Sequence, residues 1–381
     1  MFDVICTAYV AVVTILMIAT IAGLLRVNQV LAMCLLGWHT LACLGYWQVT
    51  QAQVVDAHLY FDMAKTGDVA FGIGTIAVAK FTSLFAYYLG FSFFNTFLVY
   101  NLIGAVGLIF LAAALRCGHQ AESATAFAAT ALLFLPGLSF WSSAIGKDAP
   151  AFLSACMFLF ATIDLSRRKG LAVASILIML VVRPHIAVLM GIALAGGVSF
   201  GAFRVTPRAA AVATIFAVLS AAAAWIALEY TGLAGKLSAG EIREYLESRQ
   251  GANEYGTTAI NLVGMTFPEQ VFAYLFRPLF FDARGLIWHL VSFENLVLLM
   301  LTLTMLTSWE RLRQLAKIPA ARIHMILMAT FLLLLAPITD NSGLAIRQKI
   351  MILPSLLFLV LTAWRLGRVP SGQGVASPAN V

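Results

Sequence analysis

The sequence predicts an all-α protein of the polytopic membrane class, a bundle of about eleven transmembrane helices with amphipathic or re-entrant helices on its outer side. Hydrophobic residues make up 61% of the 381-residue chain, charged residues only 11%, and the mean hydropathy is +0.93. These values lie well outside the usage of soluble domains. Apolar runs long enough to cross a hydrocarbon core, roughly 20 residues each, recur along the chain. We therefore expect a chain embedded in a bilayer.

The predicted spans follow one another along nearly the whole length. They are the runs 5–25, 29–48, 94–115, 125–143, 150–165, 209–230, 286–306, 322–338 and 350–364, together with the shorter runs 170–182 and 186–203. The run 73–92 is interrupted by Lys80 and by the pair Tyr87-Tyr88, side chains that favour a membrane interface. We interpret it as a surface or re-entrant helix, with a twelfth span as the alternative.

Topology is predicted from the basic residues of the short loops, because Lys and Arg are retained on the cytoplasmic side. If 73–92 does not cross, these residues fall on one side: Arg26, Arg116, Arg167, Arg168, Lys169, Arg204, Arg208, Arg311, Arg313, Lys317, Arg322, Arg365 and Arg368. The segments 49–93, 143–149, 183–185, 231–285 and 339–349 then face outward. The net charge of +7 is mainly a topology signal and does not indicate nucleic-acid binding.

The domain organisation predicted from these runs is a single transmembrane domain, residues 1–368, with two outer segments, 49–93 and 231–285. The last residues, 369–381, are rich in Pro, Ser and Gly and are expected to form a disordered cytoplasmic tail. The five cysteines show no paired spacing in the outer segments, so neither a disulfide framework nor a metal site is indicated.

Every stretch predicted to face outward carries a polar cluster that a bilayer does not require. In the first outer segment, Asp56 and Tyr60 are four residues apart and would share a helix face, while Asp62 would point elsewhere. A carboxylate in this position can accept the proton of an attacking hydroxyl. Asp56 is therefore the candidate base and Asp62 the reserve, although a helix cap or a solvated loop acid would have the same sequence.

Two further clusters contain candidate phosphate-binding residues. Lys147 could contact a phosphate with Asp148 orienting it; alternatively, Asp148 caps a helix and Lys147 is an interface anchor. Arg183 and His185 flank Pro184 in an otherwise apolar stretch, where charge is costly enough that a functional role is the default interpretation. Arg183 is the main phosphate-binding candidate, with His185 as its neighbour.

The second outer segment mixes aromatic residues with Arg277 and Arg284. This composition suits a surface that binds a lipid phosphate, and an ordinary aromatic belt would look the same. Glu294 lies inside a predicted span and needs a cationic partner, for which Arg277, Arg284 or Arg183 would serve. A purely structural ion pair is at least as good an interpretation of Glu294.

The last polar cluster opens the final span. Arg347 could reach a diphosphate while Asn341 and Ser342 satisfy a sugar. The alternative is a basic anchor at a helix start, which is disfavoured because the N-terminus of a helix repels cations.

Together these motifs resemble a known superfamily. They are the acid followed by Tyr in the first outer loop, the turn Phe-Trp-Ser-Ser-Ala-Ile-Gly-Lys-Asp at 140–148, Arg-Pro-His at 183–185, the Arg277 segment leading to Glu294-Asn295, and Asn-Ser-Gly-Leu-Ala-Ile-Arg at 341–347. The combination is similar to GT-C superfamily polyprenyl-phosphate-dependent glycosyltransferases and to bacterial oligosaccharide repeat-unit polymerases. The resemblance spans roughly residues 50–360.

The resemblance implies an inverting transfer of sugar or oligosaccharide from an undecaprenyl-linked donor, outside the bacterial cytoplasmic membrane, during surface-polysaccharide assembly. It implies Asp56 as base, with Arg183, Arg347 and Lys147 holding the leaving phosphate. The polyprenyl-linked sugar is the substrate, and a divalent metal is neither demanded nor excluded, because these cations could do its electrostatic work. The expected partners are membrane lipid, lipid-linked glycan and other envelope polysaccharide assembly proteins, with no nucleic acid.

The sequence leaves several readings open. Within the enzyme class, a polymerase of lipid-linked repeat units competes with a transferase that adds one sugar. A transporter or flippase for lipid-linked saccharides would also place charged groups in the membrane, but transporters favour midplane sites and often show inverted repeats, which this sequence does not display. A non-catalytic scaffold of an envelope synthesis complex is the third class.

Overall fold

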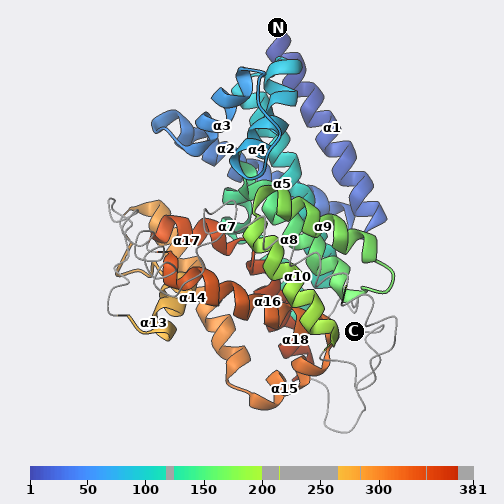
Figure 1. The fold of residues 1–381 in the computed structure, drawn as a ribbon, viewed down its shortest axis with the longest axis vertical. Coiled ribbons are helices and arrows are strands. Elements are labelled where there is room, and N and C mark those ends of the chain that lie inside the picture. Colours follow the sequence, from blue (N-terminus) through green and yellow to red (C-terminus); the bar gives the residue numbers. More distant parts are fainter. Residues whose placement is uncertain (117–123, 200–213, 215–264, 284, 340, 368–381) are drawn as a thin grey trace. The chain divides into compact units, whose positions relative to one another are not determined.

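The computed structural model describes residues 1–116, 124–199, 214, 265–283, 285–339 and 341–367 (Figure 1). The regular elements of these residues are all helices, which confirms the all-α part of the predicted fold class. Contacts divide the chain into two compact units, Met1–Pro184 and a second that begins at His185. That they form a single membrane domain stays a prediction. The predicted span 209–230, most of the segment 231–285, Arg284 and the tail 369–381 lie outside the described residues.

The first unit contains α1 (Phe2–Leu24), α2 (Gln29–Ala52), α3 (Asp56–Lys65), α4 (Thr75–Ser83), the π-helical turn η1 (Leu84–Tyr88), α5 (Phe93–Arg116), α6 (Ala124–Leu132), α7 (Pro136–Phe140), the 3-10 turn η2 (Trp141–Ser143), α8 (Asp148–Ile163) and α9 (Lys169–Val182). Three of them, α1, α2 and α5, are long and apolar enough to span a membrane. The segment 73–92 folds as α4 and η1, and neither is among the candidate spans.

The second unit contains α10 (Pro184–Ser199), α13 (Phe267–Phe276), α14 (Leu286–Leu306), α15 (Trp309–Lys317), α16 (Pro319–Leu335), the 3-10 turn η3 (Ala336–Ile338), α17 (Ser342–Lys349) and α18 (Leu353–Leu366). Its candidate spans are Trp288–Leu306 and Pro319–Ile338. The predicted last span, 350–364, begins at the break between α17 and α18, a helix pair that is bent by 62°.

The number of spans is smaller in the described residues than the predicted eleven. Five helices qualify, or up to seven if each bent pair counts as one span. The pair formed by α6 with α7 and η2 bends by 41° within the predicted span 125–143. Three further apolar helices, α8, α9 and α10, have 16, 14 and 16 residues, fewer than the roughly 20 that a straight crossing needs. The prediction of eleven spans was based on hydropathy, which depends only on the apolar residues in a run and not on where a helix bends or ends.

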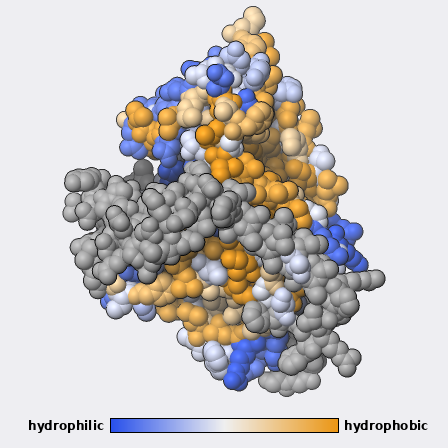
Figure 2. All heavy atoms as spheres, viewed as in Figure 1, coloured by the Kyte–Doolittle hydropathy of each residue, from blue (hydrophilic) through white to orange (hydrophobic). Residues whose placement is uncertain are grey.

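Exposed apolar side chains cover several helices, as expected of a membrane protein. Along α1, the side chains of Val4, Ile5, Val12 and Leu16 are all exposed. Figure 2 shows this helix as a largely hydrophobic surface. Such a continuous apolar face is stable in hydrocarbon and unfavourable in water, so it supports assignment of α1 to the bilayer.

Helix α5 is the centre of the first unit and packs against α1, α2, α8 and the η2 turn. Two glycines make this packing close, because a Cβ on Gly107 would lie 3.0 Å from the Leu153 Cα, and a Cβ on Gly104 only 2.1 Å from the Ser142 carbonyl oxygen. Small residues allow such approach between membrane helices. The η2 turn therefore lies directly on the backbone of α5.

A buried polar chain holds the same turn in place. The His39 ring on α2 bonds to Asn101 on α5 through Nδ1 (2.6 Å) and to the Ser142 hydroxyl of η2 through Nε2 (3.0 Å). All three side chains are buried. Because polar groups in an apolar interior must be satisfied by one another, these bonds link α2, α5 and η2 and set the start of α8.

Gly104→Ala is expected to destabilise the first unit, because the added methyl group meets the Ser142 carbonyl and the His39 ring at 2.1 and 2.7 Å. Overpacking of this kind costs about 1–3 kcal/mol, more than the roughly 1 kcal/mol that alanine gains over glycine in a helix. Gly45→Ala on α2 is the matched control, because a Cβ there meets nothing within 4 Å. Thermal unfolding in detergent should show a loss for Gly104→Ala alone; equal stability of the two variants would contradict this packing.

Candidate functional site

A buried ion pair joins the start of α8 to the end of α9. The Arg183 Nη2 donates to the Asp148 Oδ1 at 2.6 Å, and the two side chains are only 12% and 8% exposed. Asp148 is the first residue of α8, after Lys147 at the N-cap position, and Arg183 is the C-cap of α9, immediately before Pro184. Two charges this deeply buried are stable only when paired, so the pair fixes the α8 and α9 ends relative to each other.

Two cationic groups at this place can still form hydrogen bonds: Arg183, which belongs to the pair, and Lys147, which precedes Asp148 in the sequence. The Arg183 Nε is buried and makes no hydrogen bond in the described part of the chain. Lys147 precedes Asp148 and is half-buried, and its ammonium forms no hydrogen bond or ion pair with any residue that the structure describes. A guanidinium with an unused donor and an unpaired ammonium are the groups that bind phosphate oxygens.

The first predicted outer segment packs over the same place. The Gly74 N–H at the start of α4 donates to the Val181 carbonyl of α9 at 2.8 Å, two residues before Arg183. Gly74 has a φ of +65°, a conformation that glycine adopts without the strain of a side chain. The Tyr60 ring on α3 lies against Gly146, since a Cβ there would be 3.6 Å from it.

One hydrophobic core supports all of these elements. It contains Ala57, Tyr60 and Phe61 of α3, Val78 of α4, Ala144, Ile145 and Ala149 around the turn before α8, and Val182 at the end of α9. The structure therefore brings together three clusters that the sequence analysis singled out separately: the Asp56 helix, the Lys147-Asp148 turn and Arg183.

Helix α3 presents its two acids differently. Asp56 is the first residue of the helix and is exposed, while Tyr60, one turn later on the same face, is buried against the turn before α8. Asp62 is also exposed, and its position in the helix places it on another face. The N-cap position belongs to Val55, whose N–H donates to the His58 ring at 3.3 Å. Asp56 therefore does not occupy the N-cap position that its sequence also allowed.

In the second unit, Arg277 is held by an acid that the sequence analysis did not consider. Its Nε donates to the Asp282 Oδ2 at 3.0 Å, and its Nη2 donates to the other carboxylate oxygen. The bond from Arg277 holds the pKa of Asp282 below its usual value and raises that of Arg277. The Nε and Nη2 donors of Arg277, which the sequence analysis expected to bind a lipid phosphate, are thus bonded to Asp282 instead.

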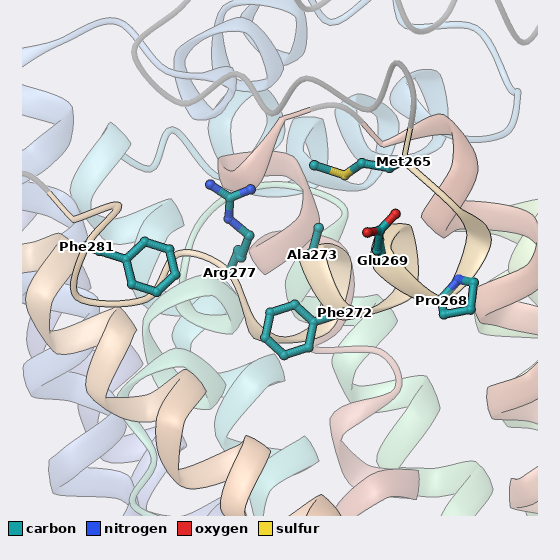
Figure 3. Close-up of a pocket in the computed structure, with 7 residues that line it drawn as sticks. All are labelled: Met265, Pro268, Glu269, Phe272, Ala273, Arg277 and Phe281. Carbon is teal, nitrogen blue, oxygen red and sulfur yellow. The ribbon is translucent and has the colours of Figure 1, made fainter.

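A pocket of about 460 Å³ opens beside Arg277 (Figure 3). Its lining residues are Met265, Pro268, Glu269, Phe272, Ala273, Arg277 and Phe281. Glu269 accepts hydrogen bonds from the Thr266 N–H (2.7 Å) and hydroxyl (2.8 Å), which lower its pKa. Both charged residues of the lining are already engaged, and the remaining surface is mostly apolar.

The same unit contains a buried lysine, Lys349, at the end of α17. Its ammonium donates to the Leu275 carbonyl at 3.1 Å and to the Asn295 side-chain oxygen, and the charge of Glu294 acts on it. The Asn295 amide in turn donates to the Pro278 carbonyl at 2.9 Å. Lys349 and Asn295 therefore attach the end of α13 and the following loop to α17 and α14.

The remaining predicted residues of the second unit have these places. Asn341 is the N-cap of α17 and accepts from the Gly343 and Leu344 N–H groups at 2.9 and 3.2 Å, a structural role that competes with sugar binding. Arg347 is half-buried within α17, and His185 is half-buried as the second residue of α10. Arg284 lies outside the described residues.

Sequence reasoning missed two groups of polar residues. The sequence analysis assigned no role to Lys349, and His39 and Asn101 lie inside the predicted apolar runs 29–48 and 94–115. The available signal was an ionisable or amide side chain within a span, which is costly and therefore positioned for a reason. The described residues contain no group of three or more His, Cys, Asp or Glu side chains that could hold a metal ion.

No protein-family model, curated protein or solved structure matches this chain. The interpretation of the site therefore rests on its residues and their geometry.

The Asp148–Arg183 pair should be strongly coupled in stability. Asp148→Asn removes the carboxylate that pairs with Arg183, and Arg183→Gln removes the guanidinium that pairs with Asp148; breaking a buried pair from one side costs about 3–5 kcal/mol. The double variant removes both charges and should lose much less than the sum of the two. Unfolding of the four proteins in detergent measures this coupling. Additive losses would show that the two side chains do not depend on each other. The more exposed pair Arg277 and Asp282, at 30% and 17%, should couple more weakly.

The Asp282 contact should weaken in acid. Since the pKa of Asp282 is lowered in the folded state, its stabilising effect is complete above the unfolded value of about 3.9 and is lost as the pH falls through the folded value. The Leu279 N–H donates to Asp282 at 3.1 Å, so its hydrogen-exchange protection factor should fall in that range. In Asp282→Asn the protection should be low and independent of pH; a pH-dependent loss of the same size there would contradict the assignment.

Proposed function

We propose that this protein is a membrane glycosyltransferase of surface-polysaccharide assembly, which transfers sugar or oligosaccharide from an undecaprenyl phosphate or diphosphate donor to an acceptor hydroxyl. The observation that carries the proposal is that one hydrophobic core contains the sequence neighbours of an exposed acid, Asp56, of an unpaired lysine, Lys147, and of a buried arginine with a free donor, Arg183. An acid to accept a proton and cations to bind a phosphate leaving group are what this transfer requires.

In the proposed site, Lys147 and Arg183 bind the phosphate of the donor. The Asp148 carboxylate orients the guanidinium and keeps its charge in place while one donor remains directed at the substrate. As the bond to the sugar breaks, negative charge grows on the phosphate, and fixed cations in a low-dielectric setting stabilise that charge. Tyr60 of the same unit is proposed as a sugar or acceptor contact. The roles that the sequence predicts for His185, Glu294, Asn341 and Arg347 of the second unit stay predictions.

Asp56 acts as the base. It accepts the proton of the acceptor hydroxyl as that oxygen attacks the anomeric carbon, and the bond between this carbon and the phosphate oxygen breaks with its electron pair leaving on the phosphate. Attack from the opposite face inverts the anomeric configuration. No electrons are exchanged with a redox partner and no nucleotide takes part. We propose that the reaction takes place at the outer face of a bacterial cytoplasmic membrane.

A second candidate, transport or flipping of a lipid-linked saccharide, is favoured by one observation in the second unit. Lys349 is 2% exposed and lies at the end of α17, where the pair α17 and α18 bends by 62°. Broken helices with ionisable residues at the break are typical of transporters. This candidate predicts that the glycan is completed normally but remains on the side of the membrane where it is made.

The test is mass spectrometry of polyprenyl-linked glycans from a deletion strain that is complemented with the wild-type, Asp56→Asn or Asp62→Asn protein. Asp62 is the matched control because both acids are exposed on α3. We expect Asp56→Asn, produced at the wild-type level, to accumulate donor as the deletion does, and Asp62→Asn to behave as wild type. Complete single repeats in the pool would identify a polymerase, and a glycan lacking one residue a single-sugar transferase.

Two outcomes would contradict the proposed function. Full activity of Asp56→Asn would exclude Asp56 as the base and favour a non-catalytic scaffold. Complete lipid-linked glycans that stay on the side of the membrane where they are made would identify a flippase. Externally added glycosidase would then digest the glycans in only one of the two vesicle orientations, inverted or right-side-out.

A further inference from the structure

A short cationic helix connects two candidate spans of the second unit. Helix α15 begins three residues after α14 ends at Leu306, and α16 begins with Pro319 two residues after α15 ends. Because α14 and α16 are both long and apolar enough to cross a membrane, their connection must lie at a bilayer surface, whichever side that is. Its side chains are therefore at the depth of lipid headgroups.

The exposed face of this helix is positively charged. Arg313 and Lys317 are exposed and Arg311 is half-buried, while the single acid of the helix, Glu310, accepts a hydrogen bond from Gln314 at 3.3 Å. Figure 2 shows a hydrophilic patch at the lower end of the view, where Figure 1 places α15. The charge is thus concentrated on one short element.

The apolar side of α15 is already used for packing within the protein. Leu315 is 1% exposed, and the helix contacts α16, α18 and the end of α14. The cationic side is therefore the one directed away from the protein. At its first turn, Trp309 is 67% exposed, and the Arg313 guanidinium lies 5.4 Å from the centre of its ring. A tryptophan beside cations is characteristic of the headgroup region of a membrane.

We propose that α15 is a binding surface for the headgroups of anionic phospholipids in the surrounding bilayer. The partner is chosen by charge complementarity and by place: the helix is at headgroup depth, its net charge is positive, and juxtamembrane Lys and Arg each gain about 1 kcal/mol near an anionic surface. Trp309 inserts at the interface, and Arg313 and Lys317 bind phosphate oxygens of neighbouring lipids. This site is separate from the proposed glycosyl transfer and does not depend on it.

The test compares two charge-matched double variants. Arg313→Gln with Lys317→Gln removes the exposed charges of α15, and Arg167→Gln with Lys169→Gln removes two exposed charges from the connection between α8 and α9. Purified full-length proteins are placed in nanodiscs of phosphatidylcholine with phosphatidylglycerol. The mass spectrometer releases each protein from its nanodisc, and the lipids that stay bound to the protein are identified. All four residues are exposed, so unfolding temperatures should match that of wild type.

We expect the α15 variant to retain phosphatidylglycerol at least about tenfold more weakly than wild type, and the α8–α9 variant to stay within about twofold. Retention by wild type should also decrease at high salt, because exposed charges are screened. Unchanged retention by the α15 variant, or an equal loss in both variants, would overturn the proposal. Displacement of the lipid by inorganic phosphate at equal concentration would instead identify a free-phosphate site and would also overturn it.

Discussion

The ion pair of Asp148 and Arg183 is the interaction on which the proposed site depends. Desolvating two charges costs several kcal/mol per ion in a protein interior, so this pair persists only because the surrounding elements hold it in position. His39 and Asn101 fix the η2 turn before α8, and the bond from Gly74 to Val181 fixes the end of α9. The same supports leave the Arg183 Nε without a partner, which is a costly arrangement unless a ligand completes it.

In the second unit, the polar groups near α13 and α17 are bonded to one another, in contrast to Arg183 and Lys147 of the first unit. Arg277 is engaged by Asp282, Asn341 caps α17, and the buried Lys349 donates to the Leu275 carbonyl and the Asn295 side-chain oxygen. These groups satisfy one another and so stabilise the segment around α13, whereas the cations of the first unit retain unused donors. This difference is why the proposed phosphate site is centred on Arg183 and Lys147 of the first unit.

Much of the fold follows from composition and periodicity, because a helix of about 20 apolar residues is stable in hydrocarbon on its own. The spans containing α1, α2 and α5 were predicted to within a few residues for this reason. The bends at α6–α7 and α17–α18 were not, since a break in an apolar run changes the local backbone without changing hydropathy. The pairing of Asp148 with Arg183 could not be predicted either, because 35 residues separate them and only the packing of α8 on α9 brings their ends together.

The most direct measurement of the central claim is the binding of undecaprenyl phosphate to purified protein in nanodiscs, for wild type and for the double variant Asp148→Asn with Arg183→Gln. The second unit offers a matched control, Asp282→Asn with Arg277→Gln, which removes an Arg–Asp pair whose donors are already engaged. We predict that loss of the first pair weakens binding by at least about tenfold, as expected for a charge-assisted contact, and that loss of the second changes it little. Equal binding by wild type and the folded Asp148→Asn, Arg183→Gln variant would contradict the proposed site.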